Sequence, residues 1–221
     1  GWVKIVGDWI DRSGGADADL MPLWDPSVLR EAVAAVHEAG ARIAVHAFSH
    51  RVIDSLIEAG VDDIEHGSGI DADQASEIAA RGIAVTPTLR QVELFADFAA
   101  QAGTKYPVYA ATMQRMYDTR VEHFQMLLDA DILLQGTDAG GYQEHGSIAG
   151  ELGLWSRWGA SSQTVIDAST WVSLHYLGRP GLVEGADADL LILDDDPRAD
   201  PLALARPTSV YIGGECAWQR P

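Results

Sequence analysis

The sequence is poor in cysteine and in basic residues, and it has no long hydrophobic run. A single cysteine, Cys216, excludes an internal disulfide framework and a cysteine-based zinc site. Fifteen Lys and Arg against 33 Asp and Glu give a net charge of -18, which argues against nucleic acid as a partner because phosphate binding needs basic patches. No apolar run approaches the ~20 residues that span a bilayer, so we expect no membrane partner and a cytoplasmic location.

What is present is an ordinary globular composition, 47% hydrophobic and 22% charged over 221 residues, arranged as short apolar segments that alternate with helical ones. The alternation predicts an α/β fold with a parallel sheet. It fits either an open flavodoxin-like sheet or the later part of an eight-stranded (β/α)8 barrel, and the start of the chain within an apolar segment favours the barrel. The predicted strands are residues 2–6, 42–45, 62–65, 83–86 and 132–135.

Two histidines follow neighbouring predicted strands. His46 ends the first apolar segment of the stretch 42–67, a helix follows, and His66 ends the second. In a β-α-β unit the strands are parallel, so both imidazoles emerge at the carboxyl edge of the sheet, where α/β proteins bind ligands. Neutral imidazole is a common ligand of zinc. A metal site and a purely structural role both remain open from these residues alone.

Other candidate residues lie on the same edge or in the same sheet. Asp138, in G-T-D-A-G-G after the fifth predicted strand, is either a turn cap or the carboxylate base of a metal site. Lys4 sits in a segment predicted to be buried, where an unpaired ammonium is costly, so it forms a carbamate or pairs with an acid. Glu65 alternates with His66 and is predicted to point to the opposite face. His145 is a candidate for contact with substrate.

The motifs, taken in order, resemble those of the metal-dependent amidohydrolase superfamily. They are V-K-I, A-V-H-A-F-S, A-G-V-D-D-I-E-H-G, T-P-T-L, G-T-D-A-G and E-G-A-D-A-D-L-L-I-L-D. The closest branch is the group related to imidazolonepropionase and the prolidase-like Xaa-Pro and Xaa-Arg dipeptidases. The resemblance implies a partial (β/α)8 barrel, about strands four to eight, over residues 1–178. Residues 179–221 then supply the C-terminal strands of a small β-sandwich.

The resemblance also implies a metal-activated hydroxide that hydrolyses a carbon–nitrogen bond in a small-molecule or dipeptide-like substrate. Lys4 matches a lysine that is carbamylated in members with two metal ions. His46 and His66 match the histidines of the second metal, and Asp138 matches the metal-bound aspartate that acts as base. The implied cofactor is one or two divalent ions, expected to be zinc, and a homo-oligomer is left open.

The sequence departs from the family pattern in one respect, because no His-x-His pair occurs anywhere in it. Family members carry this pair on the first strand, so we expect the chain to be an N-terminally truncated member that lacks strands one to three. Two alternatives stay open. One is a deaminase-like amidohydrolase with a single metal ion, and the other is a non-catalytic binding module.

Overall fold

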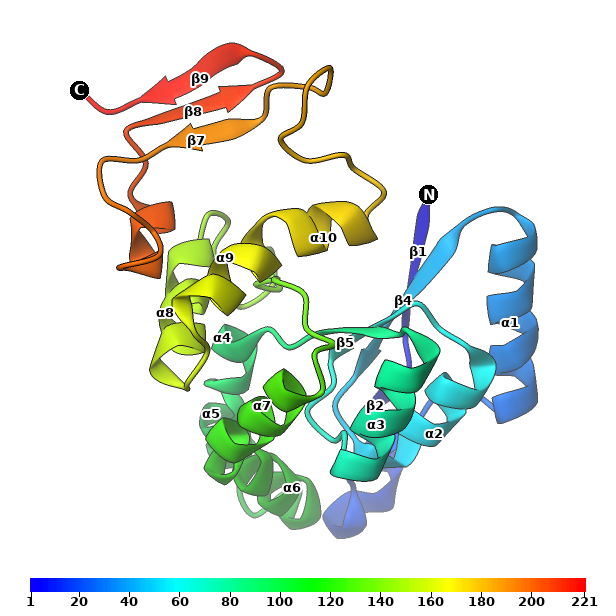
Figure 1. The fold of residues 1–221 in the computed structure, drawn as a ribbon. Coiled ribbons are helices and arrows are strands. Elements are labelled where there is room, and N and C mark those ends of the chain that lie inside the picture. Colours follow the sequence, from blue (N-terminus) through cyan, green and yellow to red (C-terminus); the bar gives the residue numbers. More distant parts are fainter. The chain divides into compact units, whose positions relative to one another are not determined.

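A parallel four-stranded sheet forms the centre of the first part of the chain (Figure 1). The computed structural model describes residues 1–221. Each strand is parallel to its neighbours, as the β-α alternation predicted. In spatial order the strands are β1 (Trp2–Val6), β4 (Arg42–Ala47), β5 (Asp63–His66) and β6 (Ala84–Thr86).

Residues 132–135, the fifth predicted strand, do not form a strand. They do lie next to β6, where a fifth parallel strand would be. Leu133 makes one parallel bridge to Val85, and the Val85 N–H donates to the carbonyl of Ile132 at 2.8 Å. The segment therefore runs beside β6 without forming a ladder. The architecture remains a parallel α/β sheet of partial-barrel type.

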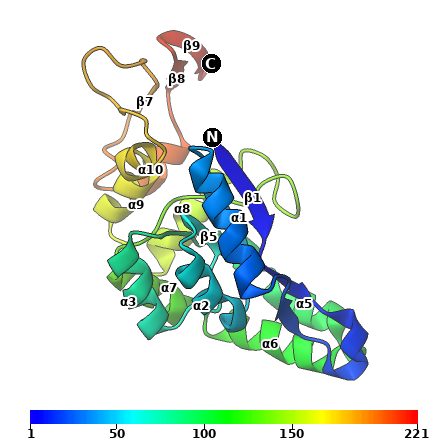
Figure 2. The same ribbon diagram turned by 90° about the vertical axis from the view of Figure 1, so that its right-hand side faces the viewer.

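Helices cover one face of the sheet, and that face is apolar. Ile43, Val45, Ile64 and Val85 have no exposed surface. Burying each such side chain contributes about 1.5–3 kcal/mol, which fixes which face the helices occupy. The first three long helices are α1 (Pro26–Glu38), α2 (His50–Ala59) and α3 (Ala72–Arg81) (Figure 2).

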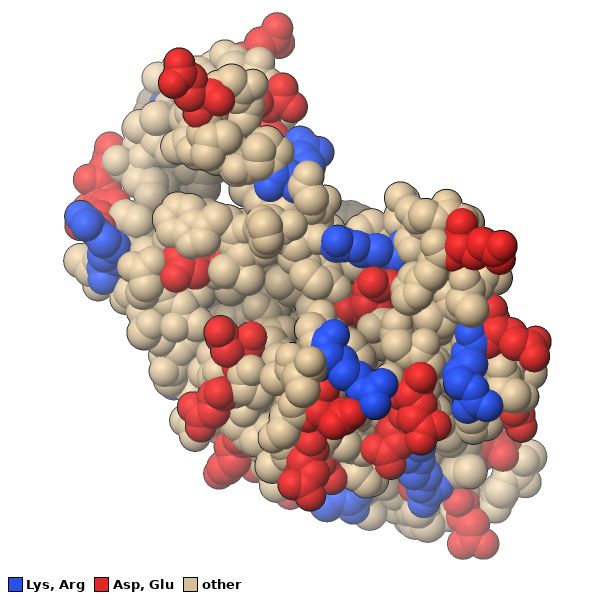
Figure 3. Space-filling view, turned by 45° about the vertical axis from the view of Figure 1, so that its right-hand side comes forward, with Lys and Arg blue, Asp and Glu red and all other residues tan.

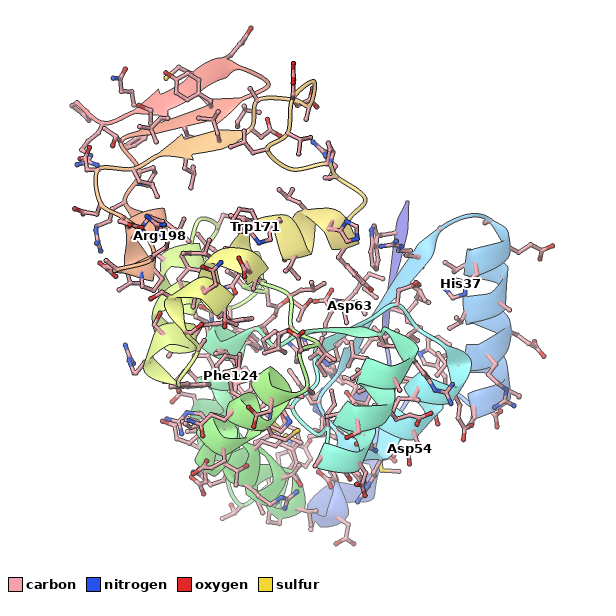
Figure 4. All side chains as sticks on the ribbon, in the orientation of Figure 1. His37, Asp54, Asp63, Phe124, Trp171 and Arg198 are labelled. Atoms are coloured by element: carbon pink, nitrogen blue, oxygen red, sulfur yellow. The ribbon has the colours of Figure 1, made fainter.

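The ends of these helices are set by local sequence. Asp25 caps α1 by accepting from the Ser27 N–H, with Pro26 in the first turn. Asp71 and Gln74 form a reciprocal capping box at the start of α3. The Gln74 side chain also donates to Asp54 Oδ1 at 2.7 Å, which ties α3 to α2 (Asp54 is labelled in Figure 4).

The segment between β1 and α1 is not a plain loop. It contains an antiparallel hairpin, β2 (Asp8–Ile10) with β3 (Leu20–Pro22), joined through a 3-10 segment, η1 (Arg12–Asp17). Leu20 of this hairpin belongs to an apolar cluster with Phe48, Phe95 and Met113. The remaining helices of this part are α4 (Leu89–Val92), α5 (Phe95–Ala102), α6 (Pro107–Asp118) and α7 (Arg120–Asp129).

The chain divides into two compact units, Gly1–Leu133 and Leu134–Pro221. The second unit contains a three-stranded antiparallel sheet, which agrees with the predicted β-rich tail. The domain boundary at residues 178 and 179 stays a prediction. The elements of this unit are α8 (Ile148–Arg157), α9 (Ser162–Ser169), α10 (Trp171–Tyr176), β7 (Leu190–Ile192), η2 (Pro201–Ala205), β8 (Ser209–Ile212) and β9 (Glu215–Gln219).

Acidic side chains predominate on the face shown in Figure 3, and the basic ones stand among them without forming a continuous patch. This distribution agrees with the net charge of -18. None of the helices combines the length and the apolar character needed to cross a membrane.

Candidate metal centre

His46 and His66 lie together at the carboxyl edge of the sheet, as the β-α-β pattern predicted. Ala47 of β4 pairs with His66 of β5, so the two strands end at the same level. The imidazole centroids are 4.7 Å apart, and both side chains are buried. Two imidazoles at this separation can ligate one ion between them.

The His66 ring reaches His46 because the backbone leaves the strand conformation at this residue. His66 has φ +68°, and Gly67 continues the left-handed turn with φ +58°. The His66 Nδ1 lies 2.6 Å from the Thr88 Oγ1 in a hydrogen bond between two buried side chains. This bond occupies Nδ1 and leaves Nε2 as the ring nitrogen available to a ligand.

His46 has a nitrogen without a partner. Its Nε2 is buried and makes no hydrogen bond, and the nearest carboxylate oxygen, Asp8 Oδ1, lies 3.7 Å away. Burial, followed by the charge of Lys4, lowers the pKa of His46 to about 4. Burial likewise holds the pKa of His66 well below its usual value. Both imidazoles are therefore neutral near pH 7, which is the form that binds a metal ion.

Asp8 is a buried carboxylate at the start of β2. It accepts hydrogen bonds from the backbone N–H groups of Phe48 and Ser49, directly after β4. Burial raises the pKa of Asp8, and these backbone hydrogen bonds oppose the rise. The carboxylate thus holds the loop that follows His46. A signal was present in the sequence, since Gly7 and Asp8 follow β1 at the edge where His46 emerges.

Glu65 and Lys4 lie on the face of the sheet that carries His46, opposite the helix-covered face. The predicted direction of Glu65 and the predicted burial of Lys4 are both wrong. Glu65 pairs in register with His46, so its side chain shares the face of His46 rather than the opposite one. The Lys4 Nζ lies 2.7 Å from the Glu65 carboxylate in an ion pair. Lys4 is not buried, because β1 is the edge strand and the lysine side chain is 46% exposed. The prediction assumed that side chains alternate regularly along β5. Glu65 keeps this alternation, whereas His66 departs from it because its backbone is left-handed.

Asp63 lies on the same face of the sheet as Lys4 and Glu65, and the sequence did not single it out. It is buried and accepts a hydrogen bond from the Thr86 Oγ1 at 3.0 Å (Asp63 is labelled in Figure 4). Burial, and then the negative charge of Glu65, raise the pKa of Asp63 to about 7. The carboxyl group of Asp63 therefore changes charge near neutral pH.

We expect the stability of the metal-free protein to report this titration. The folded-state pKa of Asp63, about 7, exceeds the ordinary aspartate pKa of 3.8, so the folded state holds the proton more tightly. The contribution of Asp63 to stability is present below about pH 4 and is lost as the pH rises to about 7. Relative to Asp63→Asn, the wild type should lose on the order of 2–4 kcal/mol over this window in urea unfolding. A stability difference that does not change with pH would contradict this environment.

Aromatic side chains enclose the histidine pair. The Phe48 ring lies 4.4 Å from His46, 4.7 Å from His66 and 4.9 Å from Phe95, measured between ring centroids. The Trp9 ring is 5.4 Å from His46 and 47% of this tryptophan is exposed. The pair is therefore shielded on the protein side, while Trp9 offers an apolar surface next to it.

A cavity opens beside His66. Ser68 Oγ in its wall is buried without a hydrogen bond, and Arg120 in the wall pairs with Glu93. The cavity thus brings a hydroxyl group and a cation near one of the two histidines. It is lined by His66, Ser68, Pro87, Leu89, Val92, Met116, Arg120, His123, Phe124 and Leu127.

Asp138 and His145 share one loop of the second unit. Asp138 has φ +55°, Gly140 has φ +109°, and a bridge between Ala139 and Gln143 closes the turn. The His145 ring lies 3.5 Å from the point where a Cβ on Gly140 would stand. Asp138 and His145 are both exposed. The two predicted residues therefore lie in one exposed loop of the second unit.

The donor set can be compared with the metal that the resemblance implies. The buried, unpartnered Nε2 of His46 and the oriented ring of His66 fit two ligands of a divalent ion. No group of three or more His, Cys, Asp or Glu side chains could hold an ion by itself. Lys4 pairs with Glu65, and its role as a bridging carbamate stays a prediction.

Gly69 fixes the loop after β5 against the loop after β4. A Cβ at this position would lie 2.5 Å from the Ser49 carbonyl carbon and 2.7 Å from the Phe48 oxygen. Both are backbone atoms, so no side chain can move aside. We expect Gly69→Ala to lower the free energy of unfolding by about 3 kcal/mol in urea titrations. Gly14→Ala, at a glycine with nothing within 4 Å, is the control, and equal stability of the two variants would contradict this packing.

A parallel sheet with paired histidines at its carboxyl edge defines an α/β protein with a barrel-type ligand site. The chain belongs to the amidohydrolase family, whose model matches residues 6–216. It is 42% identical over 215 residues to uncharacterized proteins of Mycobacterium tuberculosis and Mycobacterium bovis. The match covers 97% of this chain and 57% of those proteins, so the chain spans little more than half the length of these relatives.

Solved structures share the fold. A Xaa-Pro dipeptidase with methionine in its active site has a TM-score of 0.83 at 22% identity, covering 98% of this chain and 54% of the dipeptidase. An ochratoxinase of A. niger has a TM-score of 0.80 at 21% identity, covering 99% of this chain and 51% of the ochratoxinase. A prolidase complexed with N-methylphosphonate-L-proline has a TM-score of 0.79 at 23% identity, covering 99% of this chain and 55% of the prolidase.

Proposed function

We propose that the protein is a metal-dependent hydrolase of carbon–nitrogen bonds. The observation that carries the proposal is the His46–His66 pair, buried at the carboxyl edge of a parallel sheet in an amidohydrolase-family chain. In such a fold the carboxyl edge is the catalytic edge. The neutral state of both imidazoles is the form that a metal ion requires of its histidine ligands.

His46, His66 and Asp138 are the residues that we assign to the metal. A divalent ion held there, which we take to be zinc, would supply Lewis-acid activation of water and of the scissile carbonyl. Asp138 accepts the proton of the attacking water and returns it to the leaving nitrogen. Its place in a tight, exposed turn supports this role, because the carboxylate is held by backbone geometry while it stays accessible.

The substrate that we propose is a small dipeptide-like amide. Two of the structural neighbours are a Xaa-Pro dipeptidase and a prolidase, which cover nearly the whole chain. The exposed Trp9 ring next to His46 supports an apolar group on the substrate near the scissile bond. We propose that His145, in the same loop as Asp138, contacts the substrate.

The chemical state of Lys4 distinguishes a site with one metal ion from a site with two. Its ion pair with Glu65 supports an ammonium group, and with it the form that binds one ion. The form with two ions needs Lys4 as a carbamate, which forms only when the amine is neutral. The number of metal ions bound per chain separates these two forms.

The test of the proposed function is hydrolysis by the whole gene product after metal removal and reloading. The chelated protein should leave a panel of Xaa-Pro dipeptides and N-acyl amino acids intact. Addition of zinc should restore the cleavage of at least one of them. Cleavage that persists undiminished in the chelated protein, or its absence with every divalent ion, would overturn the proposal.

A further inference from the structure

We infer that Thr88 is the positioning residue of His66, and that its hydroxyl group determines which imidazole nitrogen faces a ligand. The inference rests on the proposed function for the identity of that ligand, a divalent ion. The orientation of the ring itself rests on the contacts of Thr88 alone.

The hydrogen bond between the two residues is short and shielded from solvent. Thr88 Oγ1 and His66 Nδ1 are 2.6 Å apart, and Thr88 and His66 are 1% and 2% exposed. Water does not compete for this bond, and a buried nitrogen left without it would cost about 1–3 kcal/mol. The ring of His66 is therefore held in one orientation.

Thr88 makes this bond instead of capping the helix that follows it. It stands at the N-cap of α4, where a threonine side chain normally accepts a hydrogen bond from the first turn. The Thr88 side chain makes no such bond, and its hydroxyl turns toward His66 instead.

The backbone at both residues is strained in the same sense. Thr88 has φ +45° and His66 has φ +68°, the left-handed region that favours glycine. The other non-glycine residues with positive φ are Asp131 and Asp138, whose side-chain type tolerates it better than a β-branched one. Each strained residue costs about 1–3 kcal/mol, and such strain persists where surrounding contacts hold it at functional sites.

The consequence concerns the tautomer of His66. The bond between Nδ1 and Thr88 Oγ1 turns Nε2 away from Thr88 and keeps the ring from flipping to exchange the two nitrogens. In the tautomer that we infer, Nδ1 donates its proton to Thr88 Oγ1 and the Nε2 lone pair is free for a ligand. The aromatic contacts with Phe48 and His46 keep the ring plane in place. Thr88 therefore prepares His66 to bind through Nε2 before any ion arrives.

The experiment compares Thr88→Val with Thr88→Ser in the whole gene product. Valine keeps the branched shape and loses the hydroxyl group, whereas serine keeps the hydroxyl group. We expect zinc affinity, measured with a competing chelator, to fall about 10- to 100-fold in Thr88→Val and to recover in Thr88→Ser. Thr86→Val is the matched control, because Thr86 bonds to Asp63 rather than to a histidine, and it should bind zinc like the wild type.

A second readout does not depend on metal. Nitrogen-15 spectra of the histidine side chains in the metal-free wild type should show His66 protonated at Nδ1, and Thr88→Val should show a mixture of tautomers. Unchanged spectra in Thr88→Val, or equal loss of zinc affinity in the valine and serine variants, would overturn the inference. If the wild type shows the fixed tautomer but binds no metal, the proposed function fails while the role of Thr88 stands.

Discussion

Asp138→Asn should lower kcat about 10³-fold when it is assayed at saturating zinc. Asparagine keeps the size of the side chain and the left-handed backbone that Asp138 adopts, with φ +55°. It cannot accept the proton of the attacking water, and a general base typically contributes 10²- to 10⁴-fold. Steady-state kinetics on the substrate found by the panel would be combined with metal analysis of the same preparations.

The control for this variant is Glu144→Gln. Glu144 is an exposed carboxylate in the same loop, so the substitution removes an equal charge from the same region. We expect its kcat to stay within about twofold of the wild type, since exposed substitutions rarely disturb a fold. Equal rates for Asp138→Asn and the wild type on every substrate would remove Asp138 from the role of base.

Replacement of either buried histidine is expected to have the second large effect. A protein zinc site contributes about 10–16 kcal/mol over its ligands, so the loss of one ligand should weaken binding by about two to three orders of magnitude. His46→Asn and His66→Asn should each lose zinc during dialysis, and hydrolysis should fall in proportion. Competition with a chelator measures the affinity directly.

His175→Asn is the matched control, because His175 lies on α10 with its side chain exposed. This variant should retain the metal content and the rate of the wild type. Retention of wild-type zinc affinity by both His46→Asn and His66→Asn would show that the pair is structural.

The sequence predicted the sheet because its strands are short apolar runs with helices between them. The same pattern predicted that His46 and His66 meet, since parallel neighbours end at one edge. It could not predict where Glu65 points. The strand rule assumes regular alternation, and the left-handed backbone of His66 brings this histidine to His46 while Glu65 already faces Lys4.

Asp8 and Thr88 were missed for a different reason. Asp8 acts on Phe48 and Ser49, 40 and 41 residues further along the chain, and Thr88 acts on His66, 22 residues before it. No local pattern encodes such contacts, because they depend on which loops the sheet brings together. The burial of β1 was overestimated because apolar composition does not distinguish an edge strand from a central one.

The measurement that tests the central claim most directly is the metal content of the whole gene product. The protein would be loaded with zinc, freed of excess metal and analysed for ions retained per chain. If His46 and His66 belong to a hydrolytic centre, the wild type retains at least one zinc ion, and one rather than two supports the ion pair of Lys4 with Glu65. A wild type that retains no divalent ion above the background of the buffer would contradict the account.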